Sequence, residues 1–274
     1  MCRMLAAAGE ASTLRLLRLL SRAFLSAVER DKLLAPVYGG YRHCDGYGYV
    51  VAVWRAGSET PHIAYVRHDT LSCSENLSSL RRSVGEVLEL AARGDKYIVV
   101  LHARKAGRGE PRGPLHAHPY RVEVETPNGP LELYVAHNGG MDKEELAATL
   151  GLPPARYTDS HLAALYLARS LSEGSTLLEA YRSLKRYVKE TSALDTAAML
   201  WPRLYLTGYV RPREEHRYRY YQPFMFEGDR IIGYVSSTVK QYADGLSLPL
   251  EYREIQGVFV EVDARSLEYK AENL

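Results

Sequence analysis

Cysteine is the second residue of the chain, and removal of the initiator methionine would place a thiol and a free α-amine on this one residue. The thiolate is the reactive form of cysteine. An α-amine with an ordinary pKa of about 7.7–8.0 can act as a general base near neutral pH. An N-terminal amine that activates its own side chain is an established form of nucleophilic catalysis. We therefore predict a nucleophilic role for Cys2, with burial as a small apolar residue of a strand as the alternative.

Two later segments carry hydrogen-bond donors that suit the anionic groups of a substrate or intermediate. Residues 102–104 (HAR) end an apolar run, and the planar guanidinium of Arg104 can pair with a carboxylate through two parallel hydrogen bonds. Residues 137–140 (HNGG) follow another apolar run, and Asn138 and Gly139 can donate side-chain and backbone N–H groups to an oxyanion. The alternatives are a surface ion pair for Arg104 and a simple turn for the Asn-Gly-Gly segment.

Hydrophobic periodicity predicts the elements that must position these residues. Strands are expected at 2–8, 50–54, 64–66, 96–102, 121–125, 131–136, 196–201, 204–210, 217–226, 229–236 and 252–262. Helices are expected at 14–28, 75–93, 142–150, 159–172 and 176–189. The segment 107–119 holds three Gly and three Pro, which predicts an irregular loop of the kind that carries binding functions. Residues 217–221 (RYRYY) alternate basic and aromatic side chains, which is typical of a half-exposed strand and also of nucleic-acid surfaces.

The alternation of expected strands and helices, with no repeat or obvious linker, predicts a single domain of mixed strand and helix content over residues 1–274. Hydrophobic residues make up 46% and charged residues 25% of the chain, as in ordinary soluble proteins. The net charge of 35 − 33 = +2 gives no strong field to attract nucleic acid or an anionic membrane. No apolar run has the length of a signal peptide or membrane span. Cys2, Cys44 and Cys73 form no CxxC pair, which argues against a disulfide framework and for a reducing, cytoplasmic location.

Two further segments contain residue types that bind metal ions. The consecutive residues 43–45 (HCD) point to different sides of an extended chain, so we do not expect them to share one ion, although Cys44 stays open as a second nucleophile. His116 and His118 lie in the 107–119 loop, and we expect His118 to support this loop rather than to share a metal with His116. We therefore predict no metal and no cofactor.

Six short motifs, taken together and in order, resemble those of the class II glutamine amidotransferases, a family of N-terminal nucleophile hydrolases. They are residues 1–3 (MCR), 45–48 (DGYG), 102–104 (HAR), 116–119 (HAHP), 137–139 (HNG) and 158–160 (TDS). No later motif matches the family. The resemblance implies an α+β fold, the four-layer αββα sandwich of the N-terminal nucleophile hydrolases.

The resemblance also implies a role for each matched residue. Cys2 would attack the side-chain amide carbon of glutamine, form a γ-glutamyl thioester and release ammonia. The α-amine of Cys2 would accept the thiol proton and later activate a water molecule. Asn138 and Gly139 would stabilise the oxyanion. Arg104 would bind the α-carboxylate of the substrate, and Asp159, which also suits a helix N-terminus, would bind its ammonium group.

Residues 105–108 (KAGR) depart from the family pattern, in which an aromatic residue, Thr and His follow the arginine. The backbone of Gly107 can still donate to the substrate, but the expected hydroxyl contact is missing, so the preference for free glutamine stays open. His118 completes the substrate-binding set. No acceptor domain is recognisable in the sequence, and the resemblance is therefore to free-standing members of the family. We expect the leaving amine near the 107–119 loop and Tyr47.

These inferences predict a cysteine-dependent amidohydrolase or glutamine amidotransferase that cleaves the side-chain amide of glutamine or of a γ-glutamyl amide. The alternative is a catalytically silent regulatory protein of the same fold that binds an amino acid. The expected partners are the substrate and a separate synthase subunit that accepts ammonia, and neither membrane nor nucleic acid is expected. The oligomeric state is not assigned.

Overall fold

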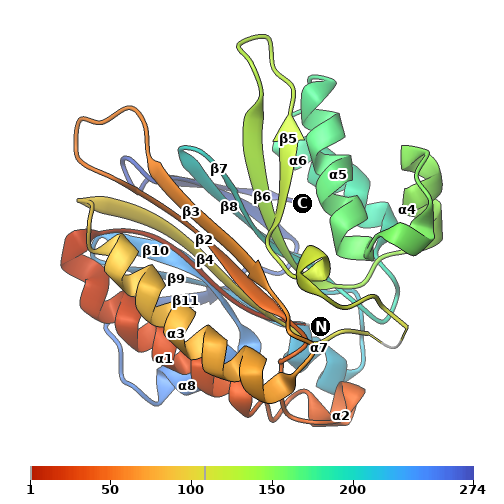
Figure 1. The fold of residues 1–274 in the computed structure, drawn as a ribbon, viewed down its shortest axis with the longest axis horizontal. Helices are drawn as coiled ribbons and strands as arrows, with labels where there is room; N and C mark the ends of the chain where they lie inside the picture. The colour runs from red at the N-terminus through yellow and green to blue at the C-terminus, as the bar shows by residue number, and fades with distance from the viewer. Residues whose placement is uncertain (1, 108) are drawn as a thin grey trace.

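The computed structural model describes residues 2–107 and 109–274 (Figure 1). Its strands form two sheets in which neighbouring strands run antiparallel. The first sheet has seven strands in the order β11-β9-β10-β1-β4-β2-β3, within the described residues. Their bounds are β1 Cys2–Glu10, β2 Tyr47–Trp54, β3 His62–His68, β4 Lys96–Arg104, β9 Pro223–Gly228, β10 Ile231–Ser236 and β11 Glu251–Glu254.

The second sheet has six strands in the order β13-β12-β8-β7-β6-β5, again within the described residues. Their bounds are β5 Tyr120–Val124, β6 Leu131–Gly139, β7 Leu194–Leu200, β8 Arg203–Gly208, β12 Val258–Asp263 and β13 Tyr269–Asn273. The helices are α1 Leu14–Glu29, α2 Ala35–Tyr38, α3 Cys73–Ala91, α4 Lys143–Leu150, α5 Asp159–Ser172, α6 Leu177–Leu184, α7 Glu215–Tyr221 and α8 Ser237–Asp244. The prediction of a mixed helix-and-strand protein is confirmed.

Alternate side chains of β1 enter two different hydrophobic clusters, because successive residues of a strand point to opposite faces of its sheet. Leu5 packs with α1, α3 and α8, which Figure 1 shows together on one side of the first sheet. Met4 and Ala6 pack instead in a cluster that also contains Ala136 of β6 and Ala197 of β7. The two sheets therefore share a buried cluster, and β1 is apolar along both faces for this reason.

The outer face of the second sheet packs against α4, α5 and α6 in a third cluster, with Leu162 and Leu167 of α5 fully buried. Figure 1 shows these helices on the side of the second sheet away from α1 and α3. Helix α5 begins at Asp159 and ends at Ser172, as predicted. Thr158 caps it by accepting a hydrogen bond from the backbone N–H of His161 at 3.0 Å.

The predicted strand at 217–226 is wrong in its first half. Residues Glu215–Tyr221 form α7, and only Pro223–Gly228 form a strand. Tyr220 and Tyr221 are adjacent and both buried, so the aromatic residues do not follow the one-sided exposure that the alternation predicted. The proline at 223 cannot continue the helix, and β9 begins there. Because Tyr220 and Tyr221 are buried, the segment does not present these two rings to a nucleic acid either.

The cysteine prediction is also wrong, because Cys44 and Cys73 form a disulfide. Their Cα atoms lie 4.9 Å apart although 29 positions separate them in sequence. The β2–β3 hairpin folds the chain back, so the start of α3 meets the segment before β2. The absence of a CxxC pair could not reveal this contact. Cys2 is left as a free, buried cysteine.

The prediction of no membrane-spanning segment is supported within the described ranges, where no helix is both long and apolar enough to cross a bilayer. The cytoplasmic location stays a prediction.

Candidate active site

Cys2 opens into a cavity of about 380 Å³ at the ends of strands from both sheets. Six of the seven predicted site residues line this cavity: Cys2, Arg104, Gly107, His118, Gly139 and Asp159. A larger cavity of about 1000 Å³ lies beside Cys44 and does not include Cys2. The smaller cavity contains the predicted chemistry, and we therefore assign the site to it.

Strand pairing places Arg104 next to Cys2. The two residues are Cα partners at the ends of β4 and β1, the central neighbouring strands of the first sheet. Arg104 is only 4% exposed, and its Nη1 donates a hydrogen bond to the carbonyl of Pro111 at 2.8 Å. The guanidinium is therefore held in the wall of the cavity and does not form the surface ion pair that was its alternative.

Asn138, the seventh predicted residue, contacts Cys2 from the second sheet. Its Oδ1 accepts a hydrogen bond from the backbone nitrogen of Cys2 at 2.8 Å. Its Nδ2 is buried and has no hydrogen-bond partner among the described residues. A buried amide nitrogen is costly to leave unpaired. The side chain also interacts with the buried carboxyl group of Asp195, and Asn138 does not itself line the cavity.

Gly139 follows at the end of β6, where the chain approaches β7 very closely. A Cβ at this position would lie 1.8 Å from the carbonyl oxygen of Ala193. Only glycine fits such an approach. The pairing of Asn138 with Asp195 and of Gly139 with Leu194 shows that the Asn-Gly segment belongs to the strand and is not a simple turn.

Asp159 lines the opposite part of the cavity at the N-terminus of α5. Its Oδ2 accepts a hydrogen bond from the backbone N–H of Met141 at 2.9 Å, and its Oδ1 accepts one from the N–H of Ser160 at 2.7 Å. The carboxylate thus stabilises the helix terminus and lines the cavity, and its contact with a substrate ammonium group stays a prediction.

Three buried histidines surround the cavity floor. Nε2 of His102 donates a hydrogen bond to the carbonyl oxygen of His137 at 3.3 Å, and Nδ1 of His137 lies 2.8 Å from Ser160 Oγ. The rings of His102 and His118 stack with centroids 4.0 Å apart. Burial lowers the pKa of His102 and of His118 well below the ordinary value, so both rings are neutral at pH 7.

Two aspartates hold the loop that covers the cavity. Asp45 pairs with Lys105 at 3.1 Å and accepts a hydrogen bond from the N–H of Ala106 at 3.0 Å. Asp69 accepts one from the N–H of Gly113 at 2.8 Å. Several hydrogen bonds outweigh the effect of burial and lower the pKa of Asp69, which keeps this carboxylate charged. The motif at 45–48 therefore acts through Asp45 as an anchor for the loop, whereas Asp69 carried no sequence signal.

Arg3 is a site residue whose role the sequence did not reveal. It is fully buried, its Nε donates to Asp31 at 2.6 Å, and its Nη1 donates to the carbonyl of Cys2 at 3.1 Å. Burial would raise the pKa of Asp31, but the charge of Arg3 and a hydrogen bond from His43 outweigh it and the pKa falls far below its ordinary value. The available sequence signal was a charged residue next to Cys2 within an otherwise apolar strand, because a buried charge needs an ionic partner.

The residues of the other candidate sites make separate contacts in the structure. In the 43–45 segment, His43 bonds Asp31, Cys44 is in the disulfide and Asp45 holds the loop, so this segment is neither a shared metal site nor a second nucleophile. The expectation that Tyr47 lies near the leaving amine is wrong. Its hydroxyl bonds Ser79 of α3 at 2.7 Å, in the cluster on the outer face of the first sheet. The predicted removal of Met1 falls outside the described residues, as does Arg108.

Comparison with solved structures shows a shared fold. The allosteric regulatory enzyme of purine biosynthesis superimposes with a TM-score of 0.60 and 15% identity, over 99% of this chain and 49% of that one. Glutamine phosphoribosylpyrophosphate amidotransferase from B. subtilis, complexed with ADP and GMP, superimposes with a TM-score of 0.59 and 12% sequence identity, again over 99% of this chain and 49% of that one. A predicted glutamine amidotransferase from Pseudomonas aeruginosa PA01 superimposes with a TM-score of only 0.40 and 13% sequence identity, over 99% of this chain and 96% of that one.

The chain thus spans about half the length of the first two structures. No family model and no curated protein matches the sequence. At these identities the likeness concerns the fold, and the chemistry of the cavity has to be argued from its own residues.

Proposed function

We propose that this protein is a cysteine-dependent amidohydrolase or amidotransferase that cleaves the side-chain amide of glutamine or of a γ-glutamyl amide. One observation carries the proposal. The backbone nitrogen of Cys2, which becomes the α-amine once Met1 is removed, bonds Asn138 at 2.8 Å in a cavity that also contains Arg104 and Asp159. Nucleophile, base, oxyanion donors and two charged anchors are then in one place. The fold shared with the two amidotransferase-related structures supports the same reaction class.

The proposed reaction proceeds through a thioester. The thiol of Cys2 transfers its proton to the α-amine, and the sulfur attacks the amide carbon of the substrate. Negative charge that develops on the carbonyl oxygen is stabilised by the unpartnered Nδ2 of Asn138 and the backbone N–H of Gly139. The protonated amine gives its proton to the leaving nitrogen, and ammonia or an amine departs. Water, deprotonated by the same amine, then hydrolyses the thioester to release glutamate.

Opposite charges at two sides of the cavity define the proposed substrate head. Arg104 suits an α-carboxylate, because a guanidinium forms two parallel hydrogen bonds with it. Asp159 suits an α-ammonium group. The backbone of Gly107 and the imidazole of His118 line the same cavity between these anchors and the loop. A volume of about 380 Å³ also leaves room for a leaving group larger than ammonia.

The proposal extends to the architecture. The shared inter-sheet cluster and the two outer clusters with helices support the four-layer αββα arrangement of the N-terminal nucleophile hydrolases. We propose a single domain over residues 1–274, which either hydrolyses its substrate outright or passes ammonia to a separate synthase subunit.

The test combines intact mass with an assay of ammonia and amine release. Protein that has lost Met1 should hydrolyse glutamine or, more efficiently, a γ-glutamyl amide with a larger leaving group, and asparagine should be a poor substrate. Cys2→Ala should abolish turnover and leave the fold intact. A diazo-ketone analogue of glutamine should label Cys2. Full activity with Met1 retained would contradict the mechanism, because an amide nitrogen is not basic. Binding of amino acids without turnover would favour a silent regulatory protein.

A further inference from the structure

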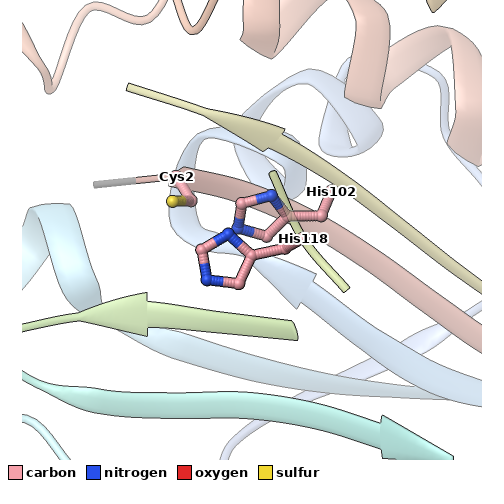
Figure 2. Close-up of side chains that lie close together, drawn as sticks. All are labelled: Cys2, His102 and His118. Carbon is pink, nitrogen blue, oxygen red and sulfur yellow. The ribbon is translucent and has the colours of Figure 1, made fainter. Parts of the chain in front are cut away.

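Cys2, His102 and His118 form a compact group of metal-ligating side chains, of which Cys2 and His118 line the cavity (Figure 2). One donor atom from each lies within 4.8 Å of the others, and all three residues are buried. Figure 2 shows the thiol of Cys2 beside the two imidazole rings, which come from different segments of the chain. Strand pairing aligns β1 directly with β4, so two of the donors are carried on the central strands of the first sheet.

Three of the four histidine ring nitrogens in this group lack the hydrogen-bond partners that buried polar atoms normally have, whereas Nε2 of His102 bonds the carbonyl of His137. Neither ring nitrogen of His118 has a hydrogen-bond partner among the described residues, and Nδ1 of His102 has none there either. His118 is only 2% exposed and His102 is fully buried. Buried imidazoles without partners are costly, and a ligand that binds them removes this cost.

The donor set favours a thiophilic divalent cation. One thiolate and two imidazoles suit Zn²⁺ or Co²⁺, whereas Mg²⁺ and Ca²⁺ prefer oxygen ligands. With Zn–S near 2.3 Å and Zn–N near 2.0–2.1 Å, tetrahedral ligands lie roughly 3.3–3.6 Å apart. Since the donors lie within 4.8 Å of one another, they would have to approach by at most about 1.5 Å on binding. The fourth position can be filled by water from the cavity or by the α-amine of Cys2.

We propose that Cys2, His102 and His118 form an inhibitory site for a Zn²⁺-like cation that occupies the nucleophile. Binding breaks the S–H bond, forms a metal–sulfur bond and releases one proton to solvent, so the thiol is no longer available to attack an amide. Removal of the ion by a chelator returns the proton and the free thiol. Binding itself follows from the three side chains alone. The inhibitory consequence rests on the proposed function.

Cobalt provides a direct readout, because a Co²⁺–thiolate bond gives a charge-transfer absorption that imidazole ligands alone do not give. Metal-free protein with intact mass verified should bind one Co²⁺ per chain with this absorption, and Zn²⁺ should displace it. Cys2→Ser should eliminate the absorption, and His118→Asn should weaken Zn²⁺ binding about tenfold or more, the scale for loss of support at a metal site. His116→Asn is the matched control and should bind as the parent does. Mg²⁺ should not compete.

Activity forms a separate arm of the experiment. Zn²⁺ should inhibit glutamine or γ-glutamyl amide hydrolysis reversibly, with full recovery after chelation. Absence of the thiolate absorption, or equal Zn²⁺ affinity in the parent, Cys2→Ser and His118→Asn, would overturn the site even if the protein is an active amidase. Co²⁺ binding in a protein that hydrolyses no amide would instead retain the site and reject the proposed function. Circular dichroism of His118→Asn guards against misfolding, and His102→Asn offers a second variant of the same site.

Discussion

At the scale of single residues, each group around Cys2 is held by a contact that also leaves it available to a substrate. Arg104 is fixed by the carbonyl of Pro111, Asp159 by two backbone N–H groups, and Asn138 by the backbone nitrogen of Cys2. Such contacts reduce the side-chain entropy that substrate binding would otherwise cost. The site is therefore preorganised by ordinary hydrogen bonds at strand ends and one helix terminus.

Arg104→Lys should reduce kcat/KM by about 10- to 150-fold, because loss of a charged hydrogen bond costs roughly 1.5–3 kcal/mol. A lysine carries one point charge and cannot form two parallel bonds with a carboxylate. Steady-state hydrolysis of glutamine and of a γ-glutamyl amide measures the effect. Arg121→Lys, at an exposed position on β5, is the control and should match the parent. Equal rates for Arg104→Lys and the parent would reject the proposed carboxylate contact.

Gly139→Ala should destabilise the fold by about 3 kcal/mol, at the upper end of ordinary overpacking costs. The new methyl group would collide with backbone, the carbonyl oxygen of Ala193, which has no flexible side chain to move away. Gly85→Ala is a matched control in α3, where a Cβ meets nothing within 4 Å. This second change should stabilise the protein by roughly 0.5–1 kcal/mol. Thermal unfolding of both variants checks the pair, and a neutral Gly139→Ala would contradict the close approach.

At the scale of elements, the disulfide joins the start of α3 to the segment that leads into β2, beside the anchors of the cavity loop. Asn76 of α3 donates from Nδ2 to the carbonyl of Cys44 at 3.0 Å and to Asp69 at 2.8 Å. Asp69 in turn holds Gly113. Helix, turn and loop thus form one connected unit, and a change at the disulfide reaches the cavity through it.

Reduction of Cys44–Cys73 should lower the free energy of unfolding by about 3–4 kcal/mol, from the loop-closure entropy of a crosslink across 29 positions. It should also raise KM, because the loop anchor at Asp69 loosens. Unfolding and kinetics with and without a phosphine reductant measure both effects. Cys73→Ser should reproduce the reduced state and respond no further to reductant. A parent protein that is unaffected by reductant, with both thiols shown to be free, would contradict the coupling.

Across the whole molecule, buried ionisable groups near the start of the chain are connected to a helix in its last fifty residues. Arg3 of β1, Asp31 and His43 form a fully buried network with Thr238 of α8, which donates to Asp31 at 2.7 Å. The network crosses from the nucleophile strand to helices on the outer face of the first sheet. The network stabilises the folded protein while Asp31 is ionised and His43 is neutral, which are the states that their lowered pKa values favour.

The protein should therefore lose stability in acid. Burial, which outweighs the hydrogen bond to Asp31, lowers the pKa of His43 from 6.5 to about 4. As pH falls from about 6.5 to 4, the unfolded chain gains a proton at this histidine and the folded chain does not, so unfolding becomes easier by about 1.4 kcal/mol per unit of pKa difference. The lowered pKa of Asp31 adds a further loss below pH 4.

Urea unfolding at pH 7.5, 5.5 and 4.5 measures this dependence. His43→Gln should be less stable than the parent at pH 7.5 and should show a shallower slope with pH. His62→Gln, at an exposed position on β3, should retain the parental slope. A parental slope in His43→Gln would assign the acid sensitivity to other groups.

The residue types of the candidate site, and several of the elements that carry them, could be predicted from the sequence alone. The thiol of Cys2, the guanidinium of Arg104 and the carboxylate of Asp159 are properties of residue types, and they can be recognised before any fold is known. Helix α5 could be bounded because apolar spacing and an N-cap at Thr158 are local signals. The strands that carry Cys2 and Arg104 were predicted for the same reason.

The contacts between residues far apart in sequence became visible only in the folded chain. Cys44 meets Cys73 across the β2–β3 hairpin, and His102 and His118 converge on Cys2. Residues Glu215–Tyr221 form α7 in place of the predicted strand, and Tyr220 packs against Arg3, whose guanidinium carbon lies 4.2 Å from the ring centroid. These contacts join positions tens to hundreds of residues apart. Local spacing cannot encode them, because they depend on how two sheets and their covering helices share buried surface.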